Sequence, residues 1–295
     1  MDFRKGERQM VKLMNLDMSD EILFDNKNYV LNSKSLGTAN ITLSTFQGFN
    51  QIGSKVSGRV VGERDIVIIG YIIAEDEEEM LEKKQGLQRV VGVLEDFYLI
   101  INDFKIRVSA KKSIEYATDY SENNKNLSKF KIEGTATEPY FTKINPTVVP
   151  IAHWLGNFHF PLSIVKDTKP QVMGIRQNSK IKMIENKGAL DTGMKITFTC
   201  KTNSISNPYL LNIVTGEHIL INCDLKLNDE LVIDTNFGHK TVTLNGEENY
   251  LYKMDLDSDF LQLHPGENYL FYDAQMEQEN GIEVSIEFST KFLEV

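Results

Sequence analysis

Two glycine pairs in the chain have the spacing of a phosphate-binding loop. Gly53 and Gly58 are five residues apart, and so are Gly188 and Gly193. A loop that holds the phosphates of a nucleotide also needs a lysine and then a hydroxyl residue directly after the second glycine. An arginine follows the first pair and a methionine follows the second. We therefore interpret both segments as ordinary loops.

An acidic stretch near the C-terminus has the spacing that begins a calcium-binding loop. Asp255, Asp257 and Asp259 alternate with other residues. Such a loop requires glycine at its sixth position and glutamate at its twelfth. Phe260 and Gly266 stand there instead. We predict a solvated acidic turn between two strands.

The histidines and cysteines do not form a recognisable metal or catalytic motif. His153 and His159 are close in sequence, but no cysteine and few acids accompany them, which does not favour zinc. Cys200 and Cys223 are too few for a disulfide framework, so we expect two buried reduced thiols, with a structural disulfide as the alternative. Neither G-x-S-x-G nor H-E-x-x-H occurs. We predict no catalytic residue, no metal ligand and no cofactor.

The composition is that of a globular protein with an acidic surface. Of 295 residues, 41% are hydrophobic, and the formal net charge is −10. The longest apolar run, Ile66–Ala74, is far shorter than the roughly 20 residues of a membrane-spanning helix, and the first residues do not resemble a secretory signal. An acidic surface repels phosphate backbones, so we expect no specific nucleic-acid binding.

The elements that must position any site are mostly β-strands in the C-terminal part. Met194–Lys201 and Ile282–Ser289 alternate strictly between apolar and polar residues, which predicts strands with one buried face. Turn residues such as Asn245-Gly246 separate further short strands. These are expected at Tyr209–Val214, His218–Asn222, Glu230–Asp234, Lys240–Leu244, Tyr250–Met254 and Asn268–Tyr272. Short strands with frequent turns indicate a β-sandwich or jelly roll.

The N-terminal part is β-rich with one helix. Arg64–Ala74 is typical of a strand covered on both faces. The acidic run Glu75–Glu79 and the apolar stripe behind it predict an amphipathic helix that ends near Gly86 or Gly92. A hairpin about Asn102-Asp103 and a strand at Ser128–Glu133 are expected to follow.

Prolines mark the expected division of the chain. Five of the seven lie between Pro139 and Pro170, together with the only tryptophan, Trp154. Because proline removes a backbone donor and stiffens the chain, this segment is interpreted as an extended connector. We therefore predict an N-terminal domain at 1–140, a connector at 141–170 and a C-terminal domain at 171–295.

An ordered set of short motifs resembles the distal tail protein family of long-tailed phages (siphophages). In the C-terminal half the set is Asn207-Pro208, Val214-Thr215-Gly216, Val232–Thr235 with Gly238, Leu244-Asn245-Gly246, Ser258–Leu263 and Pro265–Asn268. In the N-terminal half it is Arg64–Ile72, the helix after it, and Glu138–Phe141. The resemblance starts at about residue 22, so Met1–Asp20 precede it and remain unassigned.

The resemblance implies a mainly β fold, with an N-terminal ring-forming domain and a C-terminal galectin-like β-sandwich. It implies a homohexameric ring, assembled in the host cytoplasm, at the tail tip of the virion. The ring would join the tail tube, or major tail protein, to a tail-associated lysin or fibre protein, would often carry receptor-binding proteins, and would let DNA pass through its centre. The helix and hairpin at about 75–104 are the expected source of the ring interface, with Glu77, Lys84, Phe97 and Phe104 as candidates.

Two alternative hypotheses remain. The protein could be a carbohydrate-binding adhesin of the virion that contacts host cell-wall polysaccharide, with Trp154 as the stacking platform. Against this, the H-x-N-P-R pattern of galectins is absent, because Tyr209 follows Asn207-Pro208. The third hypothesis is a glycosidase or peptidase within the sandwich. A glycosidase needs two carboxylates at a set distance in space, and with 42 acidic residues the sequence does not indicate such a pair.

Overall fold

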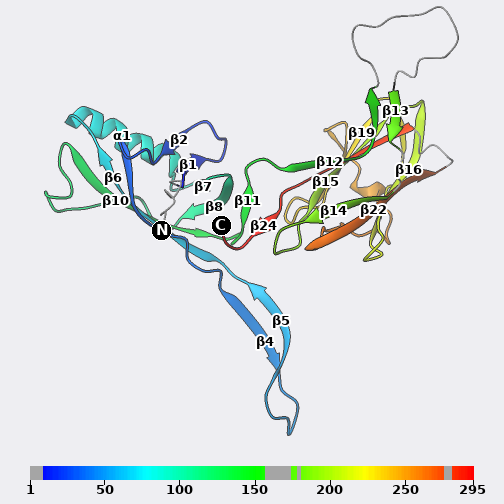
Figure 1. Cartoon of the computed structure of the whole chain (residues 1–295), viewed down its shortest axis with the longest axis horizontal. Helices are drawn as coiled ribbons and strands as arrows, with labels where there is room; N and C mark the ends of the chain where they lie inside the picture. Colours follow the sequence, from blue (N-terminus) through cyan, green and yellow to red (C-terminus); the bar gives the residue numbers. More distant parts are fainter. Residues whose placement is uncertain (1–8, 157–173, 178–180, 276–280) are drawn as a thin grey trace, which may run out of the picture. The chain divides into compact units, whose positions relative to one another are not determined.

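The computed structural model describes the backbone of residues 9–156, 174–177, 181–275 and 281–295, and the side chains of these residues except 152–156, 174–177 and 275. The chain divides into two compact units. Unit 1 comprises Met1–Ile144 together with Phe292–Val295, and unit 2 comprises Asn145–Lys291. Both are built from β-strands, and the described part contains one α-helix (Figure 1). The prediction of a mainly β chain with minor helix is confirmed.

Unit 1 contains an antiparallel sheet with the strand order β2-β1-β7-β8-β10-β6-β3. Its strands are β1 (Val11–Asn15), β2 (Glu21–Leu23), β3 (Tyr29–Ser35), β6 (Arg64–Ile73), β7 (Phe97–Ile101), β8 (Phe104–Ala110) and β10 (Leu127–Ala136). The short strands β9 (Glu115–Tyr116), β11 (Phe141–Lys143) and β24 (Lys291–Phe292) add to it, with β9 on β10 and β11 between β8 and β24. The hairpin predicted about Asn102-Asp103 is the β7–β8 pair, and Asn102 has the positive φ of 53° that such a turn requires.

Strand β6 differs in one respect from its prediction. Its alternate residues, such as Ile66, Ile68 and Ile72, are fully buried, whereas Val67 and Ile69 between them are partly exposed. Successive side chains point to opposite faces of a strand. One face of β6 is therefore buried in the core, and the other is only partly covered, so the expectation of a strand covered on both faces was wrong.

Helix α1 (Glu77–Val90) begins at a capping aspartate. The Asp76 side chain accepts a hydrogen bond of 2.9 Å from the backbone N–H of Glu79, and the Glu79 carboxylate accepts one of 2.6 Å from the N–H of Glu75. The first bond satisfies a donor that the first helical turn leaves free, and the second ties the residue before the cap to the helix. The acidic run therefore starts the helix, as predicted.

We expect Asp76→Ala to lower the free energy of unfolding of unit 1 by about 1 kcal/mol, because the N–H of Glu79 loses its acceptor. Urea denaturation followed by circular dichroism measures the effect. Gln88→Ala, at an exposed position on the same helix, is the control and should change stability by less than about 0.5 kcal/mol. Equal effects of the two substitutions would contradict a capping role.

A second, separate sheet of unit 1 is the hairpin of β4 (Ile41–Phe46) and β5 (Lys55–Val61). We call residues 41–61 the arm (blue strands β4 and β5 in Figure 1). Among the described strands, β4 and β5 pair only with each other. A backbone hydrogen bond of 2.6 Å from Gly62 to Asn40 closes the base of the arm. This hairpin was not predicted from the sequence.

Unit 2 is a sandwich of two antiparallel sheets. The larger has the order β13-β12-β23-β15-β19-β20-β21, and the smaller has the order β14-β22-β16-β17, with β18 paired to β16. The strands of the larger sheet are β12 (Thr147–Gly156), β13 (Gly174–Gln177), β15 (Met194–Cys200), β19 (Glu230–Asp234), β20 (Thr241–Leu244), β21 (Glu248–Asn249) and β23 (Ile282–Phe288). Those of the smaller are β14 (Ile181–Asn186), β16 (Ser204–Asn212), β17 (His218–Leu220), β18 (Asp224–Lys226) and β22 (Gly266–Gln275).

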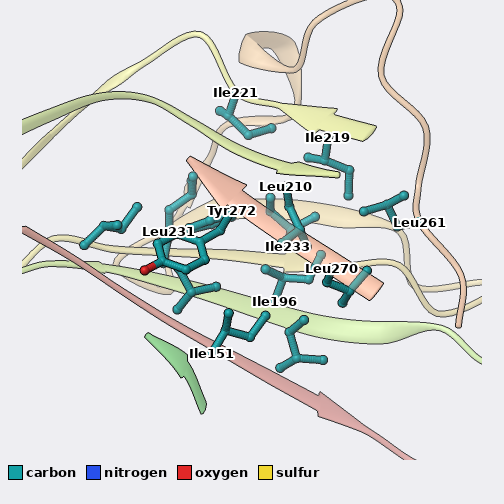
Figure 2. Close-up of a cluster of buried hydrophobic side chains, with 14 of the residues drawn as sticks. Ile151, Ile196, Leu210, Ile219, Ile221, Leu231, Ile233, Leu261, Leu270 and Tyr272 are labelled. Carbon is teal, nitrogen blue, oxygen red and sulfur yellow. The ribbon is translucent and has the colours of Figure 1, made fainter. Parts of the chain in front are cut away.

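The core of unit 2 lies between these sheets. In β15 and β23 the apolar residues of the alternating sequence are buried, and the polar residues between them are partly or fully exposed. The two strands are neighbours, with Ile196 opposite Ile286. Figure 2 shows Ile196 with Leu210 and Leu270, from strands of both sheets, among the buried side chains. The two-sheet sandwich that the turn spacing predicted is therefore present.

Two segments differ from the sequence prediction. The predicted strand Tyr250–Met254 is a 3-10 helix, Leu251–Lys253. Within the expected connector 141–170, residues 141–143 and 147–156 are strands β11 and β12, and β12 pairs with β23. Pro150 is tolerated in β12 because the register with β23 shifts there, so its missing N–H breaks no regular ladder. Residues 157–173, which include the second part of the expected connector, lie outside the described residues.

Candidate interaction surfaces

The four predicted interface residues have different surroundings. Glu77 is exposed in the first turn of α1. Lys84 lies on the same helix with its Nζ 4.8 Å from the centre of the Tyr116 ring and 3.2 Å from Asn123 Oδ1. Burial lowers the pKa of Lys84 from its ordinary value. The Lys84 ammonium therefore has partners within its own unit, whereas the Glu77 carboxylate faces solvent.

Of the two hairpin phenylalanines, one lies in the core and the other packs at its edge. Phe97 is fully buried in the core of unit 1. Phe104 is partly buried and packs edge-on against Phe292, with ring centres 5.5 Å apart. Phe97 is buried because its side chain lies on the core face of the sheet, in the hydrophobic cluster that also contains Leu99 and Leu87. The structure does not bring the four candidates together as one surface, and Phe97 stabilises the unit instead.

The last residues of the chain form a contact that the sequence did not indicate. Arg64, the first residue of β6, is fully buried, and its Nη2 donates a hydrogen bond to the carbonyl oxygen of Leu293. Its guanidinium carbon lies 5.2 Å from the centre of the Phe141 ring. Its Nε and Nη1 have no hydrogen-bond partner among the described residues. Phe292–Val295 therefore complete the surroundings of a buried cation in unit 1.

The segments with phosphate-loop spacing are explained by packing. A Cβ at Gly193 would lie 2.6 Å from the Cα of Asn236, and a Cβ at Gly188 would lie 2.6 Å from the carbonyl oxygen of Lys291. Only a residue without a side chain allows backbones to approach so closely. Gly53 has a φ of +85° in the turn of the arm. The three glycines thus serve turns and close packing.

The acidic stretch 255–259 forms a turn. Asp255 accepts hydrogen bonds from the Asn222 side chain at 3.3 Å and from the N–H of Asp257 at 3.1 Å. In the part of the chain that the structure describes, no group of three or more His, Cys, Asp or Glu side chains is placed to hold a metal ion.

Both cysteines are buried and free. The Cys200 Sγ lies 3.1 Å from the carbonyl oxygen of Thr202, and burial raises the pKa of the Cys223 thiol to about 11. A thiol with a raised pKa is mostly protonated at neutral pH and reacts slowly. The alternative of a disulfide between the two is not found in the structure.

The sandwich also carries a shallow groove on the outer face of β15, β19 and β20. Its lining is polar or aliphatic and contains no aromatic side chain: Lys195, Glu230, Val232, Asp234, Thr241 and Thr243, with residues of two adjacent turns. Trp154, the predicted stacking platform, lies in β12, but its side chain is outside the described residues.

None of the helices in the described residues is long and apolar enough to cross a membrane.

The arm is an exposed surface that was not predicted from the sequence. The first four residues of its strand β4, Ile41–Ser44, alternate between apolar and polar, and glycines mark the turn after the strand. This is a shorter form of the signal that predicted β15 and β23. Strand β4 differs from β15 and β23 in burial, since every residue of β4 is exposed.

Two family models match the chain. Residues 2–133 match the phage tail protein RIFT-related domain, and residues 187–292 match the C-terminal domain of the siphovirus-type tail component. No curated protein sequence matches.

Solved phage structures share the fold along almost the whole chain. The crystal structure of the Dit (gp 19.1) protein of phage SPP1 matches with a TM-score of 0.66 at 10% identity, covering 96% of this chain and 99% of that one. That protein is described as a paradigm of the hub adsorption apparatus in phages that infect Gram-positive bacteria. Chains of the phage P2 baseplate in its activated conformation match with TM-scores of 0.55 (with Ca, 13% identity) and 0.58 (with Sr, 14% identity). Each covers 98% of this chain and 100% of its own.

These features define a structural protein of a phage tail, with a β-rich first unit and a sandwich second unit. The chain belongs to the distal tail protein family of long-tailed phages.

Proposed function

We propose that the protein forms a homohexameric ring at the distal end of the tail tube and acts as the hub of the tail tip. The observation that carries this proposal is that both units match phage tail models, one each, in the order of a distal tail protein. The SPP1 protein that shares the fold is itself described as a hub. In this role the ring joins the tail tube, or major tail protein, to a tail-associated lysin or fibre protein, and it can also carry a receptor-binding protein.

The charge of the chain supports passage of DNA through such a ring. With 42 acidic and 32 basic residues, the formal net charge is −10. An acidic surface repels the phosphate backbone and limits binding to it. Six copies would multiply this charge around one axis. DNA would then slide through during ejection without being held.

The ring is tested by the mass and symmetry of the assembly. Native mass spectrometry and electron microscopy of the full-length chain, alone and with the tail-tube protein of the same phage, should reveal a six-fold ring. We expect the ring at least in the presence of the tube protein, since a tube end provides six equivalent sites. A chain that remains monomeric at micromolar concentration under both conditions would overturn the proposal.

A further inference from the structure

The arm has an apolar face that its own unit leaves exposed. In the β4–β5 register Leu43 is opposite Arg59 and Ile41 is opposite Val61, and opposite residues share a face. After the register shift Val56 is opposite Thr45, and it joins this face. Ile41, Leu43 and Val56 are 59%, 52% and 41% exposed. We call Ile41, Leu43, Val56, Arg59 and Val61 the arm face.

A two-stranded hairpin that packs on nothing else has little stability of its own in water. A two-stranded sheet is at best marginally stable without a third strand or a packing partner. Exposed apolar patches of this kind typically mark interaction sites. The turn continues the patch, since Phe49 and Ile52 are almost completely exposed. The arm therefore requires a partner that covers apolar side chains.

The charge of the arm indicates the chemistry of that partner. Between Thr38 and Gly62 the only charged residues are Lys55 and Arg59, so the segment carries +2 in a chain of −10. Arg59 lies among aliphatic side chains of the arm face. A complementary surface would place carboxylates around exposed apolar side chains.

Helix α1 presents such a surface. Glu77, Glu78, Leu81 and Glu82 are all exposed, and residues three and four apart lie on one face of a helix. Leu81 is 56% exposed between these acids, and Leu94, just beyond the helix, is 97% exposed. We call Glu77, Glu78, Leu81 and Glu82 the helix face.

We propose that the arm face of one copy of this chain binds the helix face of a second copy. Leu81 packs among the aliphatic side chains of the arm, and Arg59 pairs with the carboxylates of Glu78 and Glu82. The two surfaces are different parts of one chain, so the contact is head-to-tail, and repetition with a suitable rotation closes a ring. The inference rests on the proposed ring and names the elements that hold it together.

Photo-cross-linking in the full-length chain tests this contact. A benzophenone amino acid replaces Leu43 on the arm face, and in a control it replaces Phe46, which is 67% exposed on the opposite face of the arm. The assembly is made from a mixture of ¹⁴N and ¹⁵N chains, with the tube protein present if the ring requires it. We expect the probe at 43 to yield mixed-isotope cross-links to peptides of helix α1, several-fold more than the probe at 46. Cross-links within one chain only, or to other segments only, would overturn the proposal.

A charge exchange provides an independent test. Arg59→Glu and Glu78→Lys should each weaken assembly about tenfold in sedimentation velocity, and the double variant should recover most of this loss. Lys55→Glu, on the opposite face of the arm, is the matched control and should have a much smaller effect. Single variants that assemble like the unmodified chain, or a double variant without recovery, would overturn the contact. If the unmodified chain forms no ring, the proposed function is overturned. If the ring forms but the arm neither cross-links to α1 nor shows recovery in the double variant, only this inference is overturned.

Discussion

Ending the chain after Lys291 is expected to destabilise unit 1 by about 3 kcal/mol, because this removes contacts of the buried Arg64 and of the partly buried Phe104. Phe104 loses the Phe292 ring that packs edge-on against it. The fully buried guanidinium of Arg64 loses the Leu293 carbonyl that accepts its hydrogen bond. The loss should appear in unit 1, more than 140 residues away in sequence, because Phe292–Val295 belong to that unit.

Hydrogen exchange with mass spectrometry locates the effect. Amides of β6 and β8 should exchange faster after the truncation, whereas those of β15 and β23 in unit 2 should not change. A chain that ends at Leu293 is the matched control, because it keeps the Phe292 ring and an oxygen acceptor for Arg64. This control should lose less than about 1 kcal/mol, since Val295 is exposed and the new C-terminal carboxylate of Leu293 replaces the exposed Glu294 carboxylate, which lies 3.4 Å from Arg64 Nη2. Equal losses in the two truncations would contradict this account of the C-terminal residues.

Asn268→Leu is expected to cost unit 2 about 3 kcal/mol or more. The Asn268 side chain is buried, and its Nδ2 donates to the carbonyl oxygens of His264 at 2.8 Å and Gly266 at 3.1 Å. Its Oδ1 accepts from the N–H of His264 at 3.0 Å. Leucine has a similar volume but would leave all three backbone groups without these partners. Asn268 thereby fixes the turn of the Pro265–Asn268 motif that pointed to the family.

The unfolding transition of unit 2 in urea measures this loss. Glu267→Gln, at the exposed neighbouring position, is the control and should change stability by less than about 0.5 kcal/mol. Because Asn268 lies in unit 2, the transition of unit 1 should be unaffected. A loss below about 1 kcal/mol in Asn268→Leu would show that water satisfies the backbone groups of this turn.

Features that depend on neighbouring residues were predictable from the sequence alone. The alternation in 194–200 and 282–288 specified which side chains face the core, because side-chain direction in a strand is a local property. The turn residues Asn102 and Asn245-Gly246 have the positive φ values that their hairpins need. The acids before α1 specified its start for the same reason, since the cap and the free N–H groups are adjacent in sequence. The mainly β class and the sandwich followed from these local signals.

Features that depend on distant residues were decided only by the tertiary structure. Arg64 belongs to a class of residue that is almost never fully buried without a partner, and its partner lies 229 residues further along the chain. Phe97 was expected at a surface, and its burial follows from the distant residues of the core cluster, such as Leu87 of α1, that pack on its face of the sheet. The first four residues of strand β4 alternate as those of β15 do, yet all of β4 is exposed. Alternation shows that a side chain requires cover, but it does not show which part of the chain, or which other molecule, supplies that cover.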